Sequence, residues 1–216
     1  MTDRYDVTNA QGAFQPGSND RVLLNKLGLA SEEEVNEVEM HLLEQLYVEA
    51  LINHLPDRRL SVSDLKRWHY LWLGNVYDWA GQERSVNMGK GGFLFADAGQ
   101  IPRLLTRFEK DCLHRWTPCH GLSDEQLVEA IAITHVELIL IHPFREGNGR
   151  LSRLLADVMA AQAGRQPLDY SAWEAGKDAY ISAIHQGMQS NYQPMQHWVR
   201  QAMSAAFKQR GFKRRA

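Results

Sequence analysis

One short segment of the chain carries most of the side chains that could do chemistry. It reads His142-Pro143-Phe144-Arg145-Glu146-Gly147-Asn148-Gly149-Arg150-Leu151-Ser152-Arg153. The Gly147-Asn148-Gly149 run suits a backbone with positive φ angles, and successive N–H groups in such a turn form a concave anion site. A helix that follows directly would point its unpaired N–H groups and positive dipole end at the same spot. The segment therefore predicts a phosphate-binding site.

Charged side chains of suitable types surround this predicted site. Arg150 and Arg153 are spaced to share one face of the helix's first turn. A cation there is disfavoured by about 0.3–1 kcal/mol, so two arginines need a compensating anion, and a polyphosphate fits the guanidinium fork. Glu146 by itself would repel phosphate, but it could hold Mg²⁺ against phosphate oxygens. His142, which closes the preceding helix, is suited to general-base catalysis near neutral pH.

Each of these residues also has a purely structural interpretation. His142 could be stabilised only by the C-terminal end of a helix dipole. Arg153 could pair with Asp157 one turn later, and Gly-Asn-Gly could be an ordinary turn. The coincidence of all these features in one segment favours the functional interpretation.

The elements that must position this segment are mostly helices. Ser31 and Ser123 are suited to cap helices, with Glu34 and Gln126 at the capping-box positions. Apolar residues recur at helical spacing over 31–55, 61–81, 101–116, 123–142, 150–164, 171–189 and 194–208. The helix over 123–142 is apolar on most sides, so we expect it in the middle of the fold. The glycine-rich residues 84–95 predict a short hairpin or flap with Lys90 near its tip.

Length and composition limit the alternatives. The chain has 216 residues, which suits one domain over 21–208, with an irregular lead-in over 1–20 and a basic tail over 209–216. Its 24 basic and 26 acidic residues give a formal charge of −2, which argues against a broadly basic nucleic-acid binder. Cys112 and Cys119 are too few for a disulfide framework, and no apolar run reaches the ~20 residues of a membrane span. We expect a soluble, cytoplasmic protein with no membrane and no direct nucleic-acid partner.

The segment from His142 to Arg153 resembles the signature of the Fic family, His-Pro-Phe-x-[Asp/Glu]-Gly-Asn-Gly-Arg-x-x-Arg, and matches it at every defined position. The resemblance extends over about residues 21–200. Residues 24–29 resemble the lead-in of many bacterial members, Asp78-Trp79-Ala80-Gly81 with Arg84 resembles the segment before the family's flap, and 90–95 resembles the flap. The resemblance implies a mostly α, compact helical domain with a small β-hairpin flap.

The resemblance also implies a reaction, the transfer of AMP from ATP to a hydroxyl of a target protein with release of pyrophosphate. By analogy, His142 would take the proton from the target Tyr, Ser or Thr, and Glu146 would hold Mg²⁺ on the α- and β-phosphates. Phe144 would point into the core. The phosphate-binding residues implied by the signature are Gly147, Asn148 with its side chain on the α-phosphate, Gly149, and Arg150 and Arg153 on the β- and γ-phosphates.

The flap and the adenine site are less closely defined by the sequence. By analogy, the flap residues Lys90, Gly91, Gly92 and Phe93 would pair with the target segment as an added strand. Tyr180, Asn191 and Tyr192 are placed where an adenine pocket could form, although packing or capping is the interpretation that we favour for them.

One departure from the family pattern bears on regulation. Many members carry an inhibitory helix with Ser/Thr-x-x-x-Glu-Gly/Asn, whose glutamate pairs with the second motif arginine. No Ser or Thr of this chain has Glu four residues later, and Ser31 has Val35 there. We therefore expect a toxin restrained by a separate small antitoxin that contacts Arg153. The resemblance makes the ATPase subunits of DNA gyrase and topoisomerase IV candidate targets.

Three other functions remain open from the sequence. The same scaffold could transfer UMP, phosphocholine or plain phosphate, although the kinase-like branch of the family departs from Gly-Asn-Gly-Arg and this chain does not. A silent binding module is disfavoured by the intact signature. A metal hydrolase is disfavoured because no His-Glu-x-x-His occurs, and His135 is better explained as a helix-packing residue.

Overall fold

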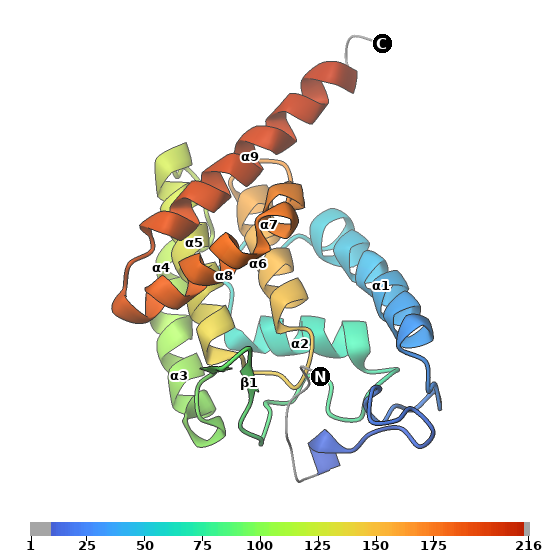
Figure 1. The fold of residues 1–216 in the computed structure, drawn as a ribbon. Coiled ribbons are helices and arrows are strands. Elements are labelled where there is room, and N and C mark those ends of the chain that lie inside the picture. Colours follow the sequence, from blue (N-terminus) through green and yellow to red (C-terminus); the bar gives the residue numbers. More distant parts are fainter. Residues whose placement is uncertain (1–9, 214–216) are drawn as a thin grey trace.

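Residues 10–213 are described by this computed structural model, with side chains up to Ala206. Among them the protein has many helices and one two-stranded hairpin, which confirms the predicted fold class (Figure 1). The long helices are α1 (Glu32–Val48), α2 (Val62–Leu73), α3 (Ile101–Phe108), α5 (Asp124–Ile141), α6 (Asn148–Gln162), α8 (Lys177–Gln186) and α9 (Gln193–Lys213). The short elements are α4 (His114–Trp116), α7 (Ser171–Ala175), and the strands β1 (Gly89–Lys90) and β2 (Phe93–Leu94).

Helix α5 lies at the centre of the fold because its surface is apolar almost all the way round. Leu127, Ile131 and Leu138 lie on one side of the helix and Val136 lies on the opposite side, and all four are buried. Helices α3, α6, α8 and α9 pack against it, and Figure 1 shows α5 and α6 side by side with α9 running across them. Dense packing on all sides fixes the last turn of α5, which is where the signature segment begins.

The helix starts follow the predicted caps. The Ser31 hydroxyl accepts from the N–H of Glu34, and Ser123 forms a reciprocal capping box with Gln126. Ser61 and Asp64 form a second reciprocal box at the start of α2. These contacts are local in the sequence, which is why the sequence predicts them well.

The structure corrects several predicted helix boundaries. The helix expected over 61–81 ends at Leu73, because the chain turns at Gly74, although Val76 and Trp79 beyond it are still buried. The helix expected over 171–189 is broken at Gly176, where a Cβ would lie 2.5 Å from the Trp198 ring. Two further helices change to π-helical winding, over Glu49–Asn53 after α1 and over Glu109–Leu113 between α3 and α4.

The ends of the chain differ from the predicted lead-in and tail. Helix α9 continues to Lys213, beyond the predicted end at 208, and 214–216 lie outside the described residues, as do 1–9. The described part of the lead-in has a 3₁₀ turn at Ala10–Gly12 and a bridge between Phe14 and Leu23. Among residues 10–213 no helix combines the length and the apolar surface that crossing a bilayer requires.

The predicted flap is a hairpin beside the end of α5. Gly89 pairs with Leu94 and Lys90 pairs with Phe93, in antiparallel register. The turn residues Gly91 and Gly92 have φ values of +58° and +79°, and a two-residue turn of this kind strongly favours glycine.

Candidate functional site

The link between α5 and α6 is a tight loop with a left-handed residue at each end. His142 is the C-cap of α5 with a φ of +51°, and Gly147 is the N-cap of α6 with a φ of +80°. A left-handed conformation costs a non-glycine residue about 1–2 kcal/mol, so the His142 turn must be held by its surroundings. The loop brings the end of α5 and the start of α6 to the edge of a cleft of about 550 Å³.

Most of the predicted site residues line this one cleft. From the loop and α6 they are His142, Glu146, Gly147, Asn148, Gly149, Arg150 and Arg153, and Lys90 comes from the hairpin. The opposite side is formed by α7 and α8, through Trp173, Glu174, Lys177, Tyr180, Ile181 and Ile184. The structure therefore places the predicted base, anion site and acidic residue around a common space.

The start of α6 has the geometry of an anion site. The first intrahelical bond is donated by Leu151 N–H to Gly147 O at 2.9 Å, so the N–H groups of residues 148–150 have no partner within the helix. Those groups and the positive dipole end of α6 favour an anion in front of them. Gly147 is required on two grounds, since its φ is positive and a Cβ would lie 2.6 Å from the Trp72 ring.

Asn148 differs from the role implied by the resemblance. Its side chain is 2% exposed and bonds the loop to itself. Asn148 Oδ1 accepts from Phe144 N–H at 2.9 Å, and Asn148 Nδ2 donates to Phe144 O at 2.7 Å. In this structure the amide therefore shapes the loop instead of reaching into the cleft. Phe144 is 1% exposed and stacks on His69 at 4.1 Å, so it points into the core as expected.

The His142 ring is held in the form that a general base needs. Its Nδ1 lies 3.2 Å from Ile139 O, and because a carbonyl can only accept, Nδ1 carries the proton and Nε2 the lone pair. The ring stacks on Phe95 with 3.6 Å between centroids. Burial lowers the pKa of His142 to about 3, with Arg84 and Lys90 acting in the same direction, so the ring is neutral at physiological pH.

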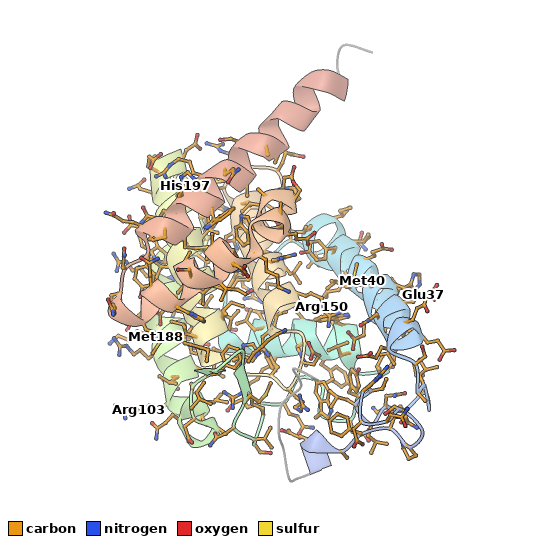
Figure 2. The ribbon with its side chains drawn as sticks, in the orientation of Figure 1. Glu37, Met40, Arg103, Arg150, Met188 and His197 are labelled. Carbon is orange, nitrogen blue, oxygen red and sulfur yellow. The ribbon has the colours of Figure 1, made fainter. Side chains whose placement is uncertain are left out.

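Arg150 is held by carboxylates of the protein itself. Its Nη2 lies 2.7 Å from Glu39 Oε2 and 3.6 Å from Glu146 Oε1, and its guanidinium lies 4.6 Å from the Trp72 ring centre. The Glu39 side chain is only 3% exposed, and its other oxygen accepts from the Tyr77 hydroxyl at 2.7 Å. Figure 2 shows Arg150 on the side of α6 that faces α1.

Arg153 is also paired, but at the surface of the cleft. Its Nη1 lies 3.0 Å from Glu174 Oε1, and the Glu174 side chain is 68% exposed. Asp157, the alternative partner one turn later, instead accepts from the hydroxyls of Tyr47 and Tyr170. The compensating anions expected beside the two arginines are thus present as carboxylates from α1 and α7, so the pair of arginines does not by itself require a polyphosphate.

Glu146 is the one acidic residue of the predicted metal site, and its side chain is 39% exposed at the edge of the cleft. Its Oε1 accepts from Gly147 N–H at 2.9 Å. Residues 10–206 contain no cluster of three acidic, His or Cys side chains able to hold a metal by themselves. A single carboxylate fits Mg²⁺ only as an ion shared with substrate phosphates, a common arrangement for this cation.

The hairpin meets the cleft from the side of His142. Lys90 lines the cleft, and Phe93 stacks on His185 of α8 with 4.2 Å between ring centroids. Phe93 is thus engaged within the protein, whereas Leu94 beside it is 79% exposed. A Cβ on either Gly91 or Gly92 would meet no atom within 4 Å, so the turn is open to solvent.

The predicted adenine residues do not lie together. Tyr180 lines the cleft, where its hydroxyl bonds His135 Nε2 at 2.7 Å and its ring stacks on Trp173. Asn191 bonds Gln186 and Tyr192 bonds Glu137, and neither lines the cleft. Neither of these two side chains therefore faces the cleft that holds the signature segment. The apolar wall that the structure provides instead is Trp173, Tyr180, Ile181 and Ile184.

Two buried residues that support the site were not identified as functional from the sequence. His69 accepts from Gly81 N–H and contacts Glu146 O at 3.1 Å, so it fixes the backbone before Gly147. Arg84 donates to backbone carbonyls at the end of α5 and beside the hairpin. Periodicity could have marked His69 as inward-facing, but nothing in the sequence indicates its partners. In the sequence, Arg84 is noted only as part of the segment that resembles the one before the family's flap, with no role of its own.

Residues 59–160, which include α2, the hairpin, α5 and most of α6, match the profile of the Fic/DOC family. This match covers 102 of the 216 residues and contains the whole segment from His142 to Arg153. A relative described as a probable protein adenylyltransferase of Sinorhizobium fredii is 28% identical over 185 residues, which is 86% of this chain and 92% of the relative. The protein adenylyltransferase Fic of Drosophila melanogaster is 32% identical over 139 residues, which is 64% of this chain but 27% of the fly protein.

Solved structures show the same Fic/DOC fold. The BepC protein of Bartonella tribocorum, a VirB-translocated effector with bound AMPPNP, superposes with a TM-score of 0.73 at 25% identity, covering 89% of this chain and 96% of that one. The N-terminal FIC domain of the Bep8 effector from a Bartonella species gives a TM-score of 0.72 at 25% identity, covering 84% and 90%.

Proposed function

We propose that this protein belongs to the Fic/DOC family and transfers AMP from ATP to a Tyr, Ser or Thr hydroxyl of a target protein. The observation that carries the proposal is that a neutral His142 with its lone pair on Nε2 shares one cleft with the N-terminus of α6. The names of the Sinorhizobium and Drosophila relatives, and the AMPPNP bound to BepC, support the same activity and substrate.

The cleft suits a nucleotide in one orientation. Phosphates would lie against the N–H groups at the start of α6, within reach of Arg153, while the base would lie on Tyr180 and Ile181. Trp173 is fully buried and stacks on Tyr180. Aromatic and apolar side chains bind a planar base, and charged donors bind the phosphates. Glu174 must leave Arg153 for a phosphate to take its place.

The proposed step forms one bond to the α-phosphorus, breaks another, and transfers one proton. The target hydroxyl oxygen attacks the α-phosphorus, its proton passes to His142 Nε2, and the bond from the α-phosphorus to the bridging oxygen breaks to release pyrophosphate. His142 starts neutral, and the anionic phosphates stabilise the imidazolium that forms. The anion site at α6 and Arg153 stabilise negative charge on the transferring group, so no covalent enzyme intermediate is needed.

Glu146 is the residue that would hold Mg²⁺, which when bound supplies charge neutralisation on the α- and β-phosphates. Its half-exposed carboxylate at the cleft edge supports that role. Its contact with Gly147 N–H keeps the carboxylate close to the start of α6.

The hairpin edge is proposed to bind the target segment as an added strand. Its two-residue strands leave backbone groups on the outer edge, and the exposed Leu94 offers an apolar contact. The ATPase subunits of DNA gyrase and topoisomerase IV are the targets that we would test first.

Restraint by a separate antitoxin is a further part of the proposal. It is supported by the lack of a Ser/Thr-x-x-x-Glu sequence in the chain. Expression of the protein alone should then be toxic and His142→Ala should remove that toxicity. Free tolerance of the active protein in cells, with no co-purifying small partner, would contradict the restraint.

The decisive experiment uses ATP labelled at either the α- or the γ-phosphate. Adenylyl transfer leaves only the α label on protein, and mass spectrometry should find an added AMP on a hydroxyl side chain. His142→Ala should lower transfer by about 10²–10⁴-fold, the usual contribution of a general base, while nucleotide binding is kept. Transfer of the γ label would indicate a kinase-like reaction, and near-normal labelling by the variant would contradict the role of His142.

A further inference from the structure

The Arg84 side chain is 2% exposed and donates to backbone carbonyls of two separate elements. Its Nε lies 2.6 Å from His142 O and its Nη2 lies 3.3 Å from Ile141 O, both at the end of α5. Its Nη1 donates to Val86 O and its Nη2 donates to Ala96 O at 2.5 Å, on either side of the hairpin. A planar fork with five N–H donors suits such a spread of acceptors, and an ammonium does not.

The contact with α5 holds a strained residue. The last carbonyls of a helix have no intrahelical donor, and the negative end of the helix dipole attracts a cation. At the C-terminus of α5, Arg84 supplies both the hydrogen-bond donors and the positive charge. It also fixes the carbonyl of His142, whose φ of +51° requires support from outside the helix.

Arg84 also supports the His142 ring indirectly, through the residues that follow the hairpin. Phe95, whose ring stacks on the imidazole at 3.6 Å, lies directly before Ala96. Its own N–H donates to Met88 O at 3.0 Å, and Ala96 N–H donates to Leu140 O at 3.3 Å. Arg84 therefore lies where the hairpin, the stacked ring and the end of α5 meet.

We infer that Arg84 is a positioning residue that holds the flap and the backbone of His142 as one unit. Its function would be to keep the hairpin edge, where the target binds, in register with the base that deprotonates the target hydroxyl. This inference rests on the proposed function only for its consequence in the reaction. The mechanical part, a flap anchored through a buried guanidinium, can be tested without any target.

Arg145, in the loop between α5 and α6, provides a matched control. Arg145 is also 2% exposed and donates through Nε to a backbone carbonyl, that of Gln11 in the lead-in. It contacts neither the hairpin nor His142 by any bond seen between described residues. Arg84→Lys and Arg145→Lys both keep the positive charge and replace a buried guanidinium with an ammonium, but only Arg84 bonds the residues that flank the hairpin.

The test measures amide hydrogen exchange over residues 86–96, affinity for a non-hydrolysable ATP analogue, and labelling of lysate proteins by α-labelled ATP. For Arg84→Lys we expect exchange over 86–96 to rise roughly tenfold or more and labelling to fall by a similar factor, since bonds from a charged donor are lost. Analogue affinity should stay within about twofold, because the phosphate site is on α6. Arg145→Lys should leave exchange over 86–96 unchanged.

Two results would overturn the inference. One is unchanged exchange over 86–96 in Arg84→Lys. The other is an equal loss of labelling, analogue affinity and unfolding free energy in both lysine variants, which is the pattern of a purely structural arginine. If the wild-type protein labels nothing, the proposed function fails while the exchange data still decide the anchoring role.

Should Arg84→Lys fail to fold, the wild-type protein supplies the measurement. The Arg84 Nε–H that is bonded to His142 O should exchange with solvent at least about tenfold more slowly than that of the exposed Arg107. An equally fast exchange would contradict the anchoring role.

Discussion

Gly147→Ala tests whether the loop before α6 depends on its left-handed glycine and on the Trp72 ring beneath it. The substitution adds a Cβ 2.6 Å from the ring at a φ of +80°. The backbone strain costs about 1–2 kcal/mol and the overpacking about 1–3 kcal/mol. We expect a loss of about 2–5 kcal/mol in the free energy of unfolding, which for a chain of this size lowers Tm by roughly 5–15 °C.

Two other glycines separate these causes. Gly92 has a φ of +79° with no atom within 4 Å of a Cβ, so Gly92→Ala should show only the backbone strain. Gly149 has no positive φ and the same open space, so Gly149→Ala should be neutral or stabilising by up to about 1 kcal/mol. Denaturant unfolding of the three variants gives the comparison. If Gly147→Ala is no less stable than Gly92→Ala, the contact with Trp72 does not constrain the loop.

Three further predictions concern charges in the cleft and two buried histidines outside it. Arg153→Ala should weaken binding of a non-hydrolysable ATP analogue roughly tenfold or more. Glu174→Gln should strengthen that binding about two- to fivefold, because the half-exposed Glu174 carboxylate no longer competes with phosphate for Arg153. Weaker binding by Glu174→Gln would show that this carboxylate helps to hold the nucleotide. Glu146→Gln should raise the Mg²⁺ concentration needed for transfer, and an unchanged Mg²⁺ dependence would remove Glu146 from the metal site. Burial lowers the pKa values of His69 and His135 to about 4, so these folded rings bind fewer protons than in the unfolded chain. Their contribution to stability is therefore complete above pH 6.5 and falls by roughly 2 kcal/mol per ring on acidification to pH 5; an NMR titration of the folded protein with an inflection near pH 6.5 for either ring would contradict this.

The functional segment could be predicted because its chemistry is local. The N–H groups of residues 148–150, the left-handed Gly147 and the base His142 lie within a few residues of one another. Helix starts at Ser31 and Ser123 are local for the same reason, since each cap bonds a residue three positions later. Breaks at Gly74 and Gly176 were missed because the apolar pattern continues across them, as buried Val76 and Ile184 show.

The charge balance of the site could not be predicted in the same way. A pair of arginines at a helix N-terminus indicates that anions lie nearby, but it does not say whether they belong to a ligand or to the protein. Glu39 reaches Arg150 from α1, and Glu174 reaches Arg153 from α7. Neither carboxylate is near the arginines in sequence, so only the packing of α1, α6 and α7 reveals the pairs.

By itself, the sequence determined a helical fold, a buried central helix and an anion site preceded by a histidine. The tertiary structure decided which groups hold that site in place. His69 and Glu146 meet across 77 residues, and Arg84 reaches His142 across 58. Such contacts depend on how helices pack around α5, a property of side-chain shapes in three dimensions that no local spacing records.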